Sequence, residues 1–500
     1  MAEQSTTDRL VLTDRLTGGE RPLWELLRLA GPTVAQMASY TVMQFIDTWM
    51  LAKALGPMAP AAASNAGSLS FAFIGFGIGV IIVVNTLVSQ NFGQKNYAHC
   101  GRYLWQGVWI ALAYSILLLP LIPLISRLFV VFGHVPEMVA MERIYVHFVI
   151  VSAAFKLVQT AFSNFMLGTN RPRWVMISSV IAVTVNAIAA YIMVFGRFGV
   201  RPMGIYGAAG AQVIGGFVEM ATLAYFALMN REQVAKFCAL DWKPRLHELR
   251  TLVRVGVGSG IQFIVEIAAW SIFMNWVMGA LGPHEMEAMA FMLRYLIVSF
   301  LPAVGISAAV TALVGRYIGM KRPDLALHRA HLGFKVTLVY FAFCGVIYFV
   351  WRRELIEVFT QDPTVVHMGA ILLIFTAFYQ VFDGMFIVYV GALRGAGDTF
   401  VPACVTAALC WGIFVFGGYA MARFFPQLSV AGPWSTGSLY GVALGLFMLI
   451  RFQRGGWRSI QLEDDGPKAG FEVIPIPPAD ASNRDTTSAK LPNVQLTAES

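Results

Sequence analysis

The sequence predicts an all-α membrane protein with twelve transmembrane helices, arranged as two pseudo-twofold-related six-helix bundles around a central cleft. Three observations lead to this fold class: the composition, a series of long apolar runs and an internal repeat. Of the 500 residues, 57% are hydrophobic and only 13% are charged, whereas about a quarter of a typical soluble chain is charged. The chain has too little charge to cover a soluble surface, so the lipid bilayer is its expected solvent.

Twelve apolar runs are long enough to cross a bilayer as helices, which takes roughly 20 residues each. Their length and their glycine and proline content favour helices over barrel strands, which alternate in hydropathy over about ten residues. The expected spans cover residues 27–52, 62–90, 104–128, 138–166, 174–197, 207–229, 254–280, 286–314, 331–351, 366–392, 400–424 and 433–452.

Lysine and arginine gather in the loops on one side of these spans, and this asymmetry predicts the orientation of the chain. Loops rich in these residues stay on the cytoplasmic side of a membrane. Both termini are therefore expected in the cytoplasm, in a multi-pass protein of the cell membrane (the inner membrane in a Gram-negative cell). The net charge of +8 follows from the same asymmetry and requires no nucleic acid as partner.

Neither the first residues nor the cysteines change this prediction, and both ends of the chain are expected in the cytoplasm. The first twenty residues lack the apolar stretch of a cleaved signal peptide. The five cysteines show no paired spacing, which argues against a disulfide framework or a zinc site. Residues 1–25 are expected to form a cytoplasmic N-terminal segment, and residues 456–500 a disordered cytoplasmic tail, because they are rich in polar residues and proline.

An internal repeat divides the membrane portion into two halves. Three sets of positions realign at a shared spacing, constant to within a single position: Val88–Lys95 with Val314–Lys321, Gln36 and Leu55-Gly56 with Gln262 and Leu281-Gly282, and Leu167–Pro172 with Arg394–Thr399. Because six spans is an even number, the two halves share one topology and are related by a pseudo-twofold axis along the membrane normal. The expected domains are an N-terminal lobe at 26–230, a basic cytoplasmic linker at 231–252 that lies over anionic lipid, and a C-terminal lobe at 253–455.

These residues resemble those of a known family, the multidrug and toxic-compound extrusion (MATE) family, and within it the NorM-like multidrug/cation antiporters. The resemblance covers about residues 25–455 and rests on a small set of motifs. They are Gly31-Pro32 followed by Asp47, Gln90–Gly93 after the second span, Asn186 followed by Phe195-Gly196, Glu266, and Asp383 followed by Leu393–Thr399. The first-lobe counterpart of the last motif carries Asn170 where the second lobe has Gly397. The resemblance implies two six-helix lobes and export of cationic or amphiphilic organic compounds against entry of Na⁺ or H⁺.

Two acids in the second lobe are the leading candidates for the coupling site, because an acid at mid-bilayer is costly and is functional by default. Asp383 shares a helical stripe with side chains suited to a cationic guest, namely Thr376, Tyr379, Gln380 and Phe386. Glu266 follows Gln262 by one turn, with Trp270 at the edge of the same face. Together Glu266 and Asp383 are expected to bind one proton or one monovalent metal cation. The alternative for each is a structural acid paired with a neighbouring helix.

The first lobe carries a third candidate acid, Asp47, which ends a stripe that includes Gln36 and Tyr40. An interfacial, solvated acid is the alternative, because Asp47 lies near the end of its span. Asn186 is expected either to supply a neutral ligand to this lobe or to hold two helices together. Glu219 and Lys156 are interpreted as a structural pair rather than as functional residues.

The sequence argues against several other functional classes. It contains no phosphate-binding loop of the GxxxxGK[ST] type, no HExxH or GxSxG set and no repeated filter loop, which disfavours a nucleotide-driven pump, a membrane enzyme and a channel. The predicted function is secondary active multidrug efflux by alternating access, with no cofactor beyond the coupling ion and with a monomeric chain. The alternative is a lipid-linked precursor flippase of the same superfamily, but such a protein needs basic residues in its cleft.

Overall fold

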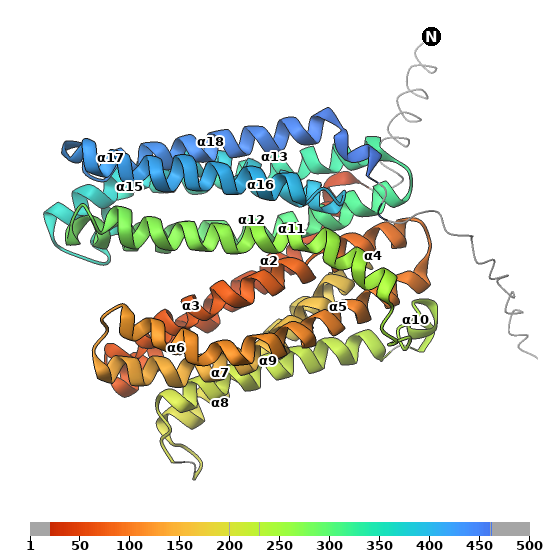
Figure 1. Cartoon of the computed structure of the whole chain (residues 1–500), viewed down its shortest axis with the longest axis horizontal. Helices are drawn as coiled ribbons and strands as arrows, with labels where there is room; N and C mark the ends of the chain where they lie inside the picture. The colour runs from red at the N-terminus through yellow and green to blue at the C-terminus, as the bar shows by residue number, and fades with distance from the viewer. Residues whose placement is uncertain (1–20, 200, 230, 461, 463–500) are drawn as a thin grey trace, which may run out of the picture. The chain divides into compact units, whose positions relative to one another are not determined.

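The computed structural model describes residues 21–199, 201–229, 231–460 and 462, and these residues are helical with short connecting turns. The expected N-terminal segment and tail therefore lie almost wholly outside the described residues. The first half of the membrane portion comprises α2 (Pro22–Leu55), α3 (Met58–Ile81), α4 (Val84–Gly93), α5 (Tyr97–Leu118), α6 (Ile122–Val131), α7 (Pro136–Gly168), α8 (Pro172–Phe195) and α9 (Ile205–Leu228). The second half comprises α11 (Leu246–Ile272), α12 (Pro283–Gly319), α13 (Pro323–Val350), α14 (Arg352–Glu357), α15 (Pro363–Gly395), α16 (Phe400–Leu409), α17 (Gly418–Phe424) and α18 (Ala431–Arg454). The short α10 (Arg231–Lys236) lies in the linker between them (Figure 1).

The predicted spans are confirmed, each falling on one helix or on consecutive helices to within two residues. Eleven helices in the described residues are long and apolar enough to cross a membrane. The twelfth crossing is α2, which runs from one end of the bundle to the other like its neighbours (Figure 1). Its polar residues, among them Gln36, Tyr40 and Gln44, lower its hydropathy.

Local sequence accounts for many of the helix ends. Six long helices begin with proline: α2, α7, α8, α12, α13 and α15. Proline suits this position because its ring presets φ and the missing N–H has no helical partner there. Two crossings also contain a π-helical stretch, Phe273–Met278 after α11 and Cys410–Gly417 between α16 and α17. Such stretches often occur at functional sites, and nothing in the apolar pattern of the sequence predicts them.

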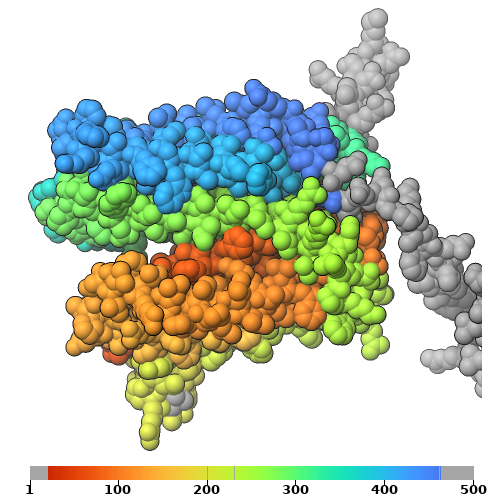
Figure 2. All heavy atoms as spheres, viewed as in Figure 1, coloured from red at the N-terminus to blue at the C-terminus, as the bar shows by residue number. Residues whose placement is uncertain are grey.

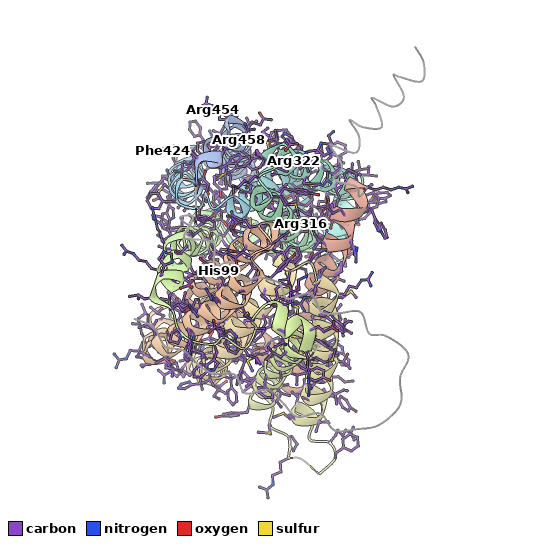
Figure 3. The ribbon with its side chains drawn as sticks, turned by 90° about the vertical axis from the view of Figure 1, so that its right-hand side faces the viewer. His99, Arg316, Arg322, Phe424, Arg454 and Arg458 are labelled. Carbon is purple, nitrogen blue, oxygen red and sulfur yellow. The ribbon has the colours of Figure 1, made fainter. Side chains whose placement is uncertain are left out.

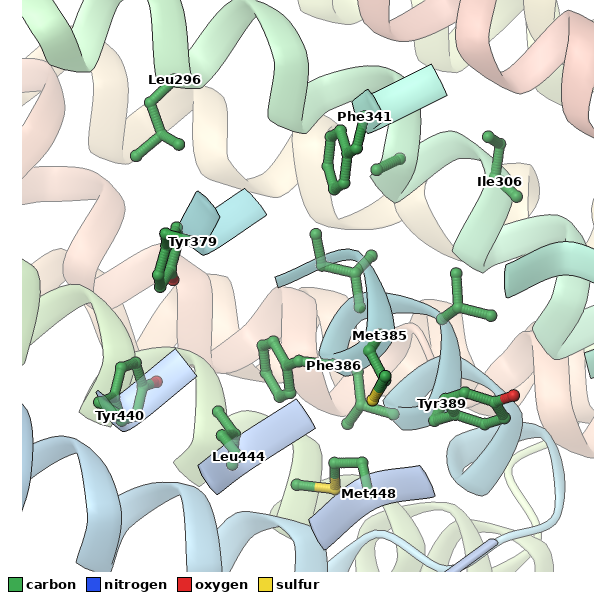
Figure 4. Close-up of a cluster of buried hydrophobic side chains, with 14 of the residues drawn as sticks. Leu296, Ile306, Phe341, Tyr379, Met385, Phe386, Tyr389, Tyr440, Leu444 and Met448 are labelled. Carbon is green, nitrogen blue, oxygen red and sulfur yellow. The ribbon is translucent and has the colours of Figure 1, made fainter. Parts of the chain in front are cut away.

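The two lobes exchange the first turns of their first helices. Leu26, Leu29 and Ala30 of α2 pack into the hydrophobic core of the second lobe, part of which is shown in Figure 4. Leu252 and Val255 of α11 pack into the core of the first lobe in the same way. The lobes accordingly meet along α2 with α12 and along α3 with α11, two pairs that the pseudo-twofold axis exchanges.

Backbone conformations follow the same repeat. Lys95 and Lys321, which are equivalent positions of the two lobes, both have a positive φ, 63° and 58°. Asn170 and Gly397 are also equivalent and have φ values of 62° and 86°. Asparagine tolerates this region better than most residues that carry a side chain. Asn170 can therefore stand where the second lobe has Gly397, because both lobes share the same turn geometry.

The lobes touch most closely at the end of the bundle that carries the basic loops, which we call the basic end. A Cβ on Gly93 would lie 2.1 Å from the carbonyl oxygen of Arg316, and a Cβ on Gly319 would lie 2.0 Å from that of Gln90. These are two copies of one contact, since the repeat relates Gly93 to Gly319 and Gln90 to Arg316. Only glycine permits such an approach of one backbone to another.

A buried ionic cluster adds to this closure. The carboxylate of Glu25 in α2 accepts hydrogen bonds from the Arg329 Nε at 2.7 Å, from the Tyr317 hydroxyl at 2.9 Å and from Arg316. Arg329 is fully buried, and Arg316 lies on the basic end together with Arg322, Arg454 and Arg458 (Figure 3). The cluster fixes the start of α2 to α12 and α13 of the other lobe. At the opposite end of the bundle the surface is hollowed between the lobes (Figure 2).

We expect Gly319→Ala to lower the stability of the protein by about 1–3 kcal/mol, because the added methyl meets the backbone of α4 and cannot be relieved by a side-chain rotation. The change is measured as a shift of the thermal unfolding midpoint of the purified protein. Gly67→Ala in α3 is the matched control, because a Cβ there meets nothing within 4 Å. Equal unfolding midpoints for the two variants would contradict the close approach of the lobes.

Candidate functional site

Asp383 lies inside the second lobe, on the middle of α15. Its side chain is 6% exposed, and its Oδ1 accepts a hydrogen bond of 3.1 Å from the hydroxyl of Tyr379, one helical turn earlier. In the described residues no arginine, lysine or histidine lies within 4.0 Å of this carboxylate. The acid is thus buried with a neutral partner.

Glu266 faces the same interior from α11. Its Oε1 accepts a hydrogen bond of 3.3 Å from the side-chain amide of Gln262, and that amide also lies 3.5 Å from the hydroxyl of Thr406 on α16. Trp270, one turn after Glu266 on α11, lies 6.5 Å from Tyr379, the hydrogen-bond partner of Asp383, so the two predicted acids face the same interior of the lobe. The Nε of Arg394 donates to the Ser259 hydroxyl at 3.2 Å.

Aromatic rings surround this pair of acids. Trp270 of α11 lies 6.5 Å from Tyr379, 4.8 Å from Phe414 and 6.3 Å from Trp434, measured between ring centroids. Tyr440 of α18 stacks on Phe414 at 5.4 Å, so rings from several crossings of the second lobe line the acids. Carboxylates next to aromatic faces suit an organic cation through charge pairing and through cation–π contact.

The remaining members of the predicted α15 stripe do not all face these acids. Gln380 is fully buried, and its amide donates to the carbonyl of Phe341 on α13 at 2.8 Å. The hydroxyl of Thr376 donates to the Leu372 carbonyl of its own helix, and Phe386 packs in the lobe core (Figure 4). The stripe is therefore divided, with Tyr379 and Asp383 near Glu266 and Gln380 directed toward α13.

In the first lobe, Asp47 is buried rather than solvated at an interface. It is 6% exposed, and its Oδ2 accepts a hydrogen bond of 3.3 Å from the amide of Gln212 on α9. Its Oδ1 has no hydrogen-bond partner among the described residues. Lys53, six residues further on, lies over the ring of Trp49 at 5.1 Å.

Asn186 of α8 is fully buried, and both its amide oxygen and its amide nitrogen lack a hydrogen-bond partner in the described part of the chain. Its Cβ lies against Gly215, one turn of α9 beyond Gln212, the partner of Asp47. A buried polar group without a partner costs free energy. The amide oxygen of Asn186 and the free oxygen of Asp47 are both of the ligand type that an inorganic cation prefers.

Gln36 and Tyr40 belong to a different polar cluster of the first lobe. The amide of Gln36 donates to the Tyr40 hydroxyl at 3.3 Å, and that hydroxyl donates to Oε1 of Glu219 on α9 at 2.5 Å. Tyr40 lies two helical turns before Asp47. The stripe predicted along α2 thus serves two separate sites, which its spacing alone does not reveal.

The lobe symmetry shows what replaces the acid pair in the first lobe. By the same repeat, Tyr40 is the counterpart of Glu266, and Lys156 is the counterpart of Asp383. The two lobes therefore present opposite chemistry at equivalent positions, an acid pair in one and a phenol with an ammonium in the other.

Glu25 and Glu142 are among the buried carboxylates that were not expected from the sequence. Glu25 is held by two arginines, as described above, and Glu142 of α7 accepts hydrogen bonds from His134 at 2.8 Å and from Asn65 at 3.1 Å. Both lie near the ends of their helices, where hydropathy predicts a solvated acid. The described residues contain no group of three or more His, Cys, Asp or Glu that could hold a metal ion.

A family model described as MatE matches residues 32–192 and 261–419, together more than half of the chain. Among curated proteins, the chain is 29% identical over 486 residues to a probable multidrug resistance protein NorM from Pseudomonas aeruginosa, covering 93% of this chain and 95% of that protein. It is 26% identical over 441 residues to a probable multidrug resistance protein NorM from Thermotoga maritima, covering 87% and 93%.

Solved structures show the same fold. One is an outward-facing conformation of a multidrug resistance MATE family transporter of the MOP superfamily, with a TM-score of 0.80, 16% identity and coverage of 88% of this chain and 98% of that one. Another is a MOP superfamily transporter from Pyrococcus furiosus, for which a binding pocket of reverse polarity suggests a different function (TM-score 0.78, 16% identity, coverage 88% and 97%). Because likeness at this level of identity shows the fold alone, the residues of this chain's own site must decide its cargo.

We expect Asn186→Leu to leave the thermal unfolding midpoint nearly unchanged while it reduces ethidium efflux from cells. The amide makes no hydrogen bond within the described residues, so its loss removes no structural bond. Gln380→Leu is the control, because it deletes the bond to the Phe341 carbonyl and should cost about 1–3 kcal/mol of stability. If Asn186→Leu destabilises the protein as much as Gln380→Leu, Asn186 holds helices together and is not a ligand.

Proposed function

Because this chain belongs to the MATE family of multidrug efflux transporters, we propose that it is a secondary active transporter that exports cationic or amphiphilic organic compounds in exchange for Na⁺ or H⁺ by alternating access. The observation that carries this proposal is a pair of carboxylates, the partly buried Glu266 and the buried Asp383, in an aromatic environment without a basic partner at ion-pair distance among the described residues.

Coupling requires only that the two cations compete for one site. A coupling ion at Glu266 and Asp383 removes the negative charge that attracts an organic cation, so the two guests exclude each other. A ligand shifts a conformational equilibrium only through its differential affinity for the two states. Competition in one state therefore links ion entry to drug release.

The orientation of the chain completes the cycle. The basic loops belong in the cytoplasm, and the lobes are joined at that end by the Gly93 and Gly319 contacts and by the Glu25 cluster. The hollow between the lobes at the opposite end (Figure 2) then faces the outside, where we propose that the coupling ion is taken up and the drug is released. One chain contains both lobes, so we propose that the monomer transports on its own and needs no cofactor. The acidic site also disfavours a lipid-linked precursor flippase, whose pyrophosphate cargo requires arginine or lysine.

We expect Asp383→Asn to reduce ethidium efflux by at least about tenfold, because losing a buried charged contact typically costs more than the 1.4 kcal/mol of a tenfold change. Efflux is measured in cells with equal amounts of transporter in the membrane. The control is Asp362→Asn, at the start of the same helix: Asp362 is solvent-accessible, and the backbone N–H of Thr364 holds the pKa of this carboxyl below its usual value. Asparagine caps a helix about as well as aspartate, so this variant keeps the hydrogen bond to the Thr364 N–H. Full efflux by Asp383→Asn would remove this acid from the mechanism.

The coupling ion is identified in proteoliposomes with imposed gradients. We expect either a pH gradient or a Na⁺ gradient to drive uptake of an organic cation, and we expect the double variant Glu266→Gln with Asp383→Asn to lose that response. A double variant that still responds to the gradient would show that the ion is bound elsewhere.

A further inference from the structure

Three side chains from three helices form a continuous hydrogen-bonded line inside the first lobe. The ammonium of Lys156 on α7 donates to the Tyr40 hydroxyl at 3.0 Å and lies 4.2 Å from the centre of the Tyr40 ring. The same hydroxyl donates to Oε1 of Glu219 on α9 at 2.5 Å. A cation and an acid are thus joined through a single phenol of α2.

Glu219 is buried and accepts its hydrogen bonds from neutral groups. It is 3% exposed, and its second donor is the amide of Gln159, at 3.1 Å. Within the described residues no basic side chain lies within 4.0 Å of its carboxylate. The positive charge that balances an ionised Glu219 is therefore that of Lys156, which is linked to it through the hydroxyl of Tyr40.

The groups that face Glu219 are few. Tyr40 faces it from α2 and Lys156 with Gln159 from α7. On α8, the side chain of Asn186 packs against Gly215 of α9, one turn before Glu219, and this side chain does not titrate. On α9 itself the hydroxyl of Thr222 bonds to the Glu219 backbone carbonyl. Lys156 is partly exposed whereas Glu219 is buried, so the ammonium can leave the line while Glu219 cannot.

We propose that Glu219 is a proton-binding site of the first lobe and that its protonation releases the ammonium of Lys156 from Tyr40. With Glu219 ionised, the line carries no net charge and Lys156 is held. A proton on Glu219 leaves one uncompensated positive charge in a poorly solvated place, which favours movement of the ammonium toward water. A proton needs no cavity, so the packed environment of Glu219 does not prevent its binding.

This inference rests on the proposed transport function and adds a second coupling element to it. Lys156 stands at the first-lobe position that corresponds to Asp383. A proton on Glu219 adds one positive charge to the first lobe, and we expect this charge to weaken the binding of an organic cation by repulsion. Proton entry into one lobe thereby favours drug release from the other, without any contact between proton and drug.

The test is equilibrium binding of tetraphenylphosphonium to the purified full-length protein at pH 8. Glu219→Gln imitates the protonated acid, so we expect it to weaken binding about tenfold, within the usual range of coupling between two sites. The double variant Glu219→Gln with Lys156→Met should restore binding to within about threefold of the wild type, because the released charge is gone. Glu142→Gln is the control for loss of a buried acid elsewhere in the same lobe.

Each outcome decides the matter. Wild-type binding by Glu219→Gln, or weak binding by the double variant, overturns the inference, because a purely structural acid is not rescued by removing Lys156. If Glu219→Gln does not fold, binding to the wild type and to Lys156→Met is compared as the pH is lowered from 8; binding should weaken more in the wild type, and equal weakening in both overturns the inference. Asp383→Asn separates the two proposals: if it abolishes binding while Glu219→Gln does not weaken it, the proposed function stands and only this inference fails.

Discussion

The structure depends on one electrostatic constraint, the cost of holding a carboxylate in the interior of a membrane protein. The chain meets this cost in two ways. Glu25 is bound by two arginines and a tyrosine at the basic end, where it ties the lobes together. Asp383 and Glu266 receive only neutral hydrogen bonds. Acids of the first kind are satisfied within the protein, whereas we propose that acids of the second kind bind a cation from outside.

The pseudo-twofold symmetry separates what both lobes share from what differs between them. The glycine crossings, the turns with positive φ and the exchanged first turns of α2 and α11 obey the symmetry. These features shape the bundle and its closure. The polar positions at Tyr40 and Lys156, set against Glu266 and Asp383, break it. A scaffold that is symmetric can rock about its axis, while the asymmetric polar residues make the interiors of the two lobes chemically different.

Hydropathy, the repeat and the residue motifs were enough to predict the fold and the family, because the bilayer forces every crossing into a helix of limited length. The interior of the lobes was less accessible. A helical stripe describes one helix alone, so it grouped Gln380 with Asp383 and Tyr40 with Asp47 although neighbouring helices separate them. The buried environment of Glu142 and the link from Glu219 to Lys156 through Tyr40 depend on contacts between helices far apart in sequence. The roles of the site residues in transport remain predictions.

The most direct measurement of the central claim is the affinity of the purified protein for a fluorescent organic cation, titrated with the coupling ion in the absence of any gradient. The account predicts mutual exclusion: the apparent dissociation constant rises in proportion to the ion activity, without saturating, and the ion loses affinity equally when the organic cation is bound. An apparent dissociation constant that does not change with Na⁺ or with pH would show that the two cations do not share the carboxylates.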